Sequence, residues 1–173
     1  MAISLYEVTV LGFIQTVGAL EGALKKGRDW CVEKGVSPEE LVETRIYADM
    51  FPLRFQVCQI ANHSVGAIEA VKAGRYGRPD VPQLDYAGLQ QLLADTSAKL
   101  KACKPAEVNA LEGKEVLFNP VEHLKMNFTA TDFLLSFSLP NFHFHATTAY
   151  DILRMKGVPV GKRDYLGQMR VKN

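Results

Sequence analysis

The stretch LPNFHFHATTAY, residues 139–150, decides the interpretation of this sequence, because it holds two of the four histidines. In a strand His143 and His145 share one face, whereas in a helix they lie about 200° apart and Asn141 projects together with His145. Pro140 is typical of a first helical turn or of a kink. Two apolar rows at helical spacing favour the helix: Phe142, Ala146, Ala149 and Leu153, and Phe144, Thr148 and Ile152. We therefore expect a deeply buried helix.

Three other segments also repeat apolar residues at steps of three and four. They cover residues 4–35, 51–74 and 85–103. The first opens with a capping box, Ser4-x-x-Glu7, and Asp85 is the expected cap of the third. Four long amphipathic helices predict an all-α fold, an antiparallel four-helix bundle.

The remaining segments are shorter. Residues 37–50 are predicted to form a short helix and a loop, and residues 74–82 a loop. The runs 115–118 and 124–128 flank an Asn-Pro turn and predict a small β-hairpin before the last helix. Thr131 or Asp132 is expected to cap that helix, which ends near Gly157.

Size and composition limit the class of protein. A chain of 173 residues without a Pro/Ser-rich linker is expected to form a single domain, residues 1–173. Twenty basic and nineteen acidic residues give a net charge of +1, which predicts neither a nucleic acid nor a membrane as partner. Three scattered cysteines indicate reduced thiols. The N-terminus lacks signal-peptide character, and we expect a cytoplasmic protein.

His63, on the second helix, and His145, on the last, are the candidate metal ligands. Facing helices of a bundle can hold a divalent transition metal with neutral imidazoles. Asn141 could add a weak oxygen ligand or bond a bound water. Alternatively, both histidines are satisfied interior residues. His143 is expected on another helix face, and His123 in the hairpin turn, exposed to solvent.

Other clusters carry weaker signals. Arg45, Asp49 and Arg54 could bind an anion or substrate, or could form an ion-paired helix end. Thr147, Thr148 and Tyr150 offer hydroxyls, although helical threonines usually bond to the preceding turn. The sequence GVPVGKR from Gly157 fails the spacing of a phosphate-binding loop. No nucleophile elbow is present.

Four segments carry a family resemblance. These are MAISLYEVTV at residues 1–10, ADMFPLRFQVCQIANH at 48–63, LPNFHFHATTAYDILRMKGV at 139–158 and GKRDYLG at 161–167. The chain resembles the bacterial domain-of-unknown-function family nineteen ninety-three, similar to the DinB/YfiT-like putative metalloenzymes. The resemblance implies an up-down-down-up four-helix bundle, a homodimer and, in metal-binding members, three histidine ligands. His63, Asn141 and His145 occupy the matching positions, so asparagine replaces the middle histidine.

Two functional hypotheses follow. The first is an enzyme of transferase or hydrolase type that depends on one divalent transition metal, zinc or nickel, held by His63 and His145. This hypothesis rests on analogy with relatives that are metal-dependent or thiol-dependent enzymes. The second is a non-catalytic protein that binds an unknown small molecule or partner through a degenerate metal site, which the asparagine at position 141 favours.

Overall fold

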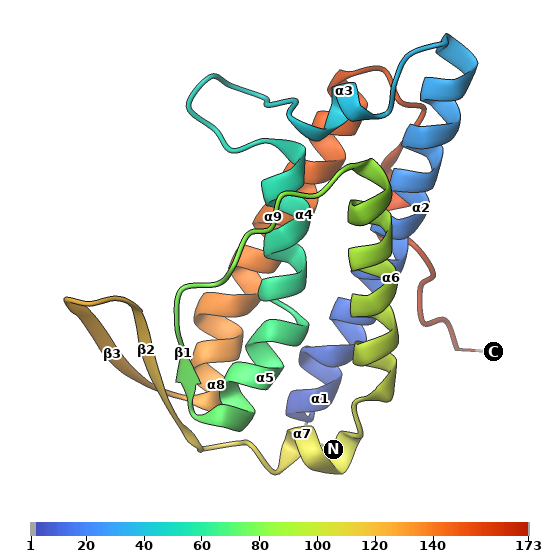
Figure 1. The fold of residues 1–173 in the computed structure, drawn as a ribbon. Helices are drawn as coiled ribbons and strands as arrows, with labels where there is room; N and C mark the ends of the chain where they lie inside the picture. The colour runs from blue at the N-terminus through green and yellow to red at the C-terminus, as the bar shows by residue number, and fades with distance from the viewer. Residues whose placement is uncertain (1–2, 173) are drawn as a thin grey trace.

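The computed structural model describes residues 3–172, so Met1, Ala2 and Asn173 of the predicted domain lie outside the described residues. Four helical columns lie side by side (Figure 1). They are formed by α2 (Val10–Lys34), α4 (Leu53–Asn62) continued by α5 (Val65–Ala73), α6 (Tyr86–Ala102) and α9 (Leu139–Met155). Helix α4 packs on α6 and α9, and α2 packs on the same two helices. The fully buried side chains between them include Phe13, Leu89, Leu93 and Phe142.

Short helices precede, connect or follow the columns. They are α1 (Leu5–Val8), α3 (Glu39–Val42), α7 (Pro105–Asn109), α8 (Ala130–Asp132) and α10 (Lys162–Leu166). The predicted capping box at Ser4 and Glu7 is present, and the Asp85 side chain accepts a hydrogen bond from Gly88 N–H, as predicted. Helix α2 ends as predicted at Gly35, whose φ of 66° is a left-handed conformation that glycine adopts without strain. Sequence patterns did not predict α7 and α10, which are each only five residues long.

A three-stranded sheet lies at one end of the helices (Figure 1). The predicted hairpin is formed by β2 (Glu115–Val121) and β3 (Leu124–Thr129), which are antiparallel. The two residues of β1 (Arg75–Tyr76) pair with β2 in parallel, with Arg75 opposite Leu117. The expectation of an all-α fold with at most a hairpin is therefore corrected. A two-residue strand is too short to show an alternating pattern in the sequence.

The second predicted helix is interrupted, which corrects the expectation of one helix from 51 to 74. Helix α4 ends at Asn62, and α5 begins at Val65. Ser64, whose side chain is buried, donates its hydroxyl to Ile60 O at 2.7 Å, in competition with the regular backbone pattern. His63 thus lies at a turn between two helices, and its side chain is buried in the interior.

The last helical column begins earlier and less regularly than predicted. Its cap is Thr129, whose hydroxyl accepts from Asp132 N–H, and not Thr131 or Asp132. Residues Phe133–Ser138 form a π-helical segment, η1, that ends with Leu139 N–H donating to Leu134 O, five residues back. Pro140 follows directly and has no N–H to donate. The wide turn therefore occurs where the proline removes an ordinary helical hydrogen bond, and α9 continues from it.

The stretch Leu5–Lys34, which contains α1 and α2, is long and apolar enough to cross a membrane. Its most apolar 18 residues have a mean hydropathy of 1.2, and half of them are buried inside the protein. The core helix of a soluble protein has the same properties.

Candidate functional site

The structure brings His63 and His145 together inside the protein. His63 follows the last turn of α4, His145 lies in the middle of α9, and these two helices pack on each other. Only 3% of His63 and 8% of His145 is exposed. The centroids of the two imidazole rings are 5.7 Å apart, with an angle of 10° between the ring planes. The pair predicted to converge from two separate helices is therefore adjacent.

Gln56 determines which nitrogen of His145 carries the proton. Its amide N–H donates to Phe51 O at 2.8 Å, so the amide oxygen faces His145 Nδ1 at 2.7 Å. Because this oxygen can only accept, His145 Nδ1 must be the donor. Nε2 of the neutral ring then keeps its lone pair, and this is the tautomer that binds a metal through Nε2. Sequence reasoning missed Gln56, although it lies two helical turns before His63.

His63 sits among aromatic rings and has an unsatisfied nitrogen. Its ring centroid is 5.4 Å from that of Phe137 and 6.2 Å from that of Tyr76. Its Nδ1 is buried without a hydrogen-bond partner among the described residues. Leaving such an atom unpaired costs about 1–3 kcal/mol, so its burial calls for an explanation. Its backbone carbonyl accepts from the buried Ser138 hydroxyl at 2.9 Å, which ties this turn to the π-helical segment.

Both imidazoles are neutral at physiological pH. Burial lowers the pKa of His63 to about 4, with a further contribution from the nearby His145. Burial alone lowers the pKa of His145 to about 4. Neutral imidazole is the form that transition metals bind, so no proton has to leave either ring first.

Asn141 is less well placed than the two histidines. It is half-buried on α9, and its side-chain N–H donates to Phe137 O at 2.7 Å, on the same helical column. Within residues 3–172, no group of three or more histidine, cysteine, aspartate or glutamate side chains is arranged to hold a metal ion. The strong donors of this site are therefore two imidazoles.

The spacing of the imidazoles fits one shared ion. Zinc–nitrogen bonds of about 2.0–2.1 Å would place two ring centroids roughly 5 Å apart on a tetrahedral ion. The observed separation between the centroids is 5.7 Å, which is close to this distance. The two-imidazole set fits an ion whose remaining positions stay open.

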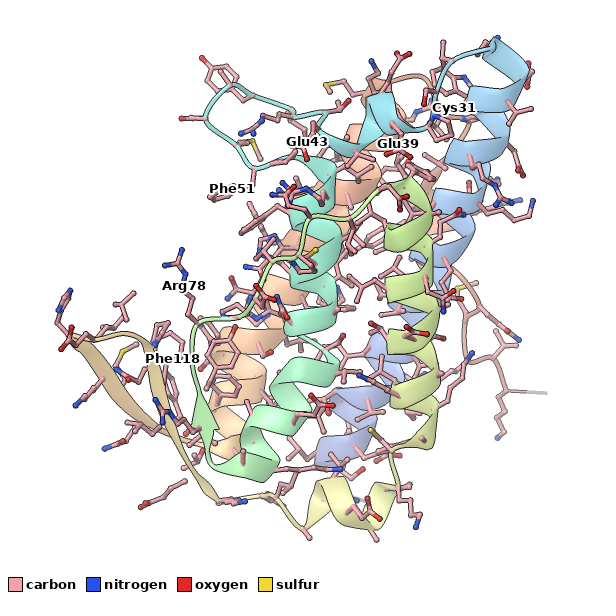
Figure 2. The ribbon with its side chains drawn as sticks, viewed as in Figure 1. Cys31, Glu39, Glu43, Phe51, Arg78 and Phe118 are labelled. Atoms are coloured by element: carbon pink, nitrogen blue, oxygen red, sulfur yellow. The ribbon has the colours of Figure 1, made fainter. Side chains whose placement is uncertain are left out.

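Aromatic side chains form the outer rim of the site. The rings of Phe55 and Phe144 lie edge-to-face against His145, at 5.9 and 5.3 Å between centroids. Phe51 stacks on Phe55 at 4.0 Å and points away from the helices (Figure 2). Phe51 and Phe144 are 58% and 57% exposed, so the rim connects the buried histidines to the surface.

The other histidines are outside this site, as predicted. His143 is exposed on another face of α9, and partial burial of its ring lowers its pKa. His123 is exposed in the turn between β2 and β3.

The polar clusters singled out in the sequence have structural roles. Arg54 donates to Glu43 Oε1 at 2.7 Å and to Pro82 O, and Arg45 donates to Met50 O, whereas Asp49 is exposed. The ion-paired helix end is therefore the better interpretation of that cluster.

The hydroxyls after His145 are also engaged. Thr148 donates to Phe144 O at 2.8 Å, and Thr147 donates to the Tyr165 hydroxyl. The ring of Tyr150 packs edge-to-face against that of Tyr165. These contacts fix α10 against α9 and leave the three side chains without a role at the histidine pair.

Comparison with known proteins gives the family. The sequence profile of a domain of unknown function (DUF1993) matches residues 5–166. The chain belongs to this family. The crystal structure of a DinB family member protein from Shewanella denitrificans is also similar, with 28% sequence identity and a TM-score of 0.79. That match covers 98% of this chain and 95% of the Shewanella chain. Comparison with curated proteins found no match. This member of the DUF1993 family is thus a DinB-like protein.

Proposed function

We propose that this DUF1993 protein folds as the up-down-down-up four-helix bundle of DinB-like proteins, in one domain over residues 1–173. Helices α2 and α9 run in one direction, and α4, α5 and α6 run in the other (Figure 1). Each of α2, α4, α6 and α9 packs on two others. One hydrophobic cluster extends from Leu5 to Val160, which supports a single domain.

We propose further that His63 and His145 hold one divalent transition-metal ion, zinc or nickel. One observation carries this proposal. Two neutral imidazoles are buried side by side, and Gln56 leaves the lone pair of His145 Nε2 free, while no hydrogen bond satisfies His63 Nδ1. Two imidazole ligands leave open positions for a substrate, which is typical of catalytic rather than structural metal sites.

The surrounding residues support a transferase or hydrolase. When bound, the ion supplies Lewis acidity that polarises a substrate or activates a thiol or water. Gln56 holds the orientation and tautomer of the His145 ring. Phe55 and Phe144 pack edge-to-face against that ring. The amide oxygen of Asn141 offers a weak third donor or a hydrogen-bond acceptor for a substrate.

A second candidate function is a non-catalytic small-molecule-binding protein with a degenerate metal site. It is favoured because Asn141 donates its amide N–H to Phe137 O and because a third strong ligand is lacking among the described residues. In that case the aromatic rim, rather than an ion, provides the affinity.

Cobalt(II) titration tests the metal proposal, because imidazole ligation gives visible absorption bands. We expect one equivalent of Co²⁺ to develop such bands with the wild-type protein. The double variant His63→Leu, His145→Gln should not develop them, while His123→Gln, at an exposed position, should behave as wild type. Circular dichroism establishes that each variant is folded. Identical cobalt spectra for the wild type and the folded double variant would refute the site.

We also propose a cytoplasmic homodimer without nucleic-acid or membrane partners. Three free cysteines, two of them buried, support a reducing compartment. Light scattering at micromolar concentration tests the dimer, and a monomeric mass would contradict it.

A further inference from the structure

A groove separate from the histidine pair lies between α2, the end of α6 and the C-terminal segment. Its volume is about 680 Å³, within the range of small-molecule sites. The C-terminal segment runs beside α2 (Figure 1). Gln15 donates its side-chain N–H to Leu166 O at 2.8 Å, and Gly167 approaches α2 so closely that a Cβ there would contact Ala19. This anchoring holds one wall of the groove against the helix.

The groove combines apolar walls with two positive charges. Its apolar side chains are Leu11 and Ile14 on α2, and Met169 and Val171 on the C-terminal segment. Met169 and Val171 are 58% and 71% exposed, so both side chains are accessible to a ligand in the groove.

The two charges belong to Lys101 and Arg170. Neither has an ion-pair partner within residues 3–172, and the lining contains no acidic residue. Arg170 helps to lower the pKa of Glu7, after the hydrogen bonds from Ser4, but that carboxylate is occupied by Ser4. The two cations therefore remain available to an anion.

We propose that this groove binds a small carboxylate with an unbranched apolar tail, such as a medium-chain fatty acid. Lys101 and Arg170 complement the carboxylate, and the apolar side chains of α2 and of the C-terminal segment cover the tail. The inference goes beyond the proposed metal function, because none of the groove residues contributes to the histidine pair.

Gly18 provides a matched pair of variants. It lines the groove, and a Cβ added there would meet no atom within 4 Å. A Cβ added at Gly22 would also meet no atom within 4 Å, but Gly22 does not line the groove. Leucine is a better helix former than glycine, so Gly18→Leu and Gly22→Leu should both fold. Only Gly18→Leu fills the groove.

Calorimetric titration with decanoate tests the proposal, with decanol and acetate as probes that lack the charge or the tail. We expect one decanoate per chain, and weaker binding of both control probes. Gly18→Leu should abolish binding and Gly22→Leu should preserve it. The double variant Lys101→Gln, Arg170→Gln should weaken binding at least about tenfold.

The proposal would be overturned if decanoate does not bind, if Gly18→Leu binds decanoate unchanged, or if decanol binds with equal affinity. It would also be overturned by a lower mass of Gly18→Leu in light scattering. The last result would instead identify the groove as an interface between two copies. Stronger binding to phosphatidylglycerol vesicles than to decanoate would assign the groove to a membrane surface and would likewise overturn the proposal.

Discussion

Acid should destabilise this protein through the histidine pair. The pKa of each imidazole falls from 6.5, its ordinary value, to about 4 in the folded state. The folded state therefore binds fewer protons than the unfolded state between these pH values. Stability is fully present above pH 6.5 and is lost as the pH falls towards 4.

The size of this effect follows from the shift. Each pH unit below 6.5 costs about 1.4 kcal/mol per imidazole, so pH 5 costs roughly 2 kcal/mol for each histidine and roughly 4 kcal/mol for the pair. This is a large fraction of the typical stability of a small domain, about 5–15 kcal/mol.

Urea denaturation at pH 8 and pH 5, with EDTA present, measures the effect. The comparison is with His63→Leu, His145→Gln, in which the glutamine N–H can still donate to Gln56. The loss of unfolding free energy between the two pH values should be about 4 kcal/mol smaller in this variant than in the wild type. His123→Gln should retain the full wild-type loss. An equal loss in the wild type and the double variant would refute the reasoning.

Two further predictions concern single positions. Gly27→Ala should destabilise the protein by about 1–3 kcal/mol, because the added Cβ would overlap the Tyr86 hydroxyl, which donates to Leu24 O. Gly22→Ala, at a position with open space, should instead stabilise the helix by up to about 1 kcal/mol. Equal melting temperatures for the two variants would argue against this packing. Gln56→Leu should weaken Co²⁺ binding about 10- to 100-fold by releasing the His145 tautomer, as measured by competition with a chelator, and unchanged affinity would mean that Gln56 does not support a metal ligand.

The helices were predictable because their signals are local and repeated. The apolar rows around His145, the capping box at Ser4 and the cap at Asp85 each depend on residues a few positions apart. The two-residue strand β1 and the break after Asn62 were not predictable in this way. The strand exists only through its pairing with β2, and the break coincides with a buried serine that bonds to its own helix.

The proximity of His63 and His145 was predicted from facing helices of a bundle, although His63 lies at the turn after α4 and not on a helix face. The environment of the pair was not. The tautomer of His145 depends on Gln56, a polar residue that the sequence offers no reason to bury, and on the carbonyl of Phe51. The unsatisfied nitrogen of His63 arises from the turn between α4 and α5 and from the rings of Tyr76 and Phe137, which approach from distant segments.

Elemental analysis tests the central claim most directly. Tag-free protein purified without chelator is compared with His63→Leu, His145→Gln prepared in the same way. A metal site at this histidine pair predicts one zinc or nickel ion per wild-type chain and none in the folded variant. A metal-free wild-type protein that also takes up no zinc or nickel on dialysis would contradict the claim, and it would favour the non-catalytic binding protein.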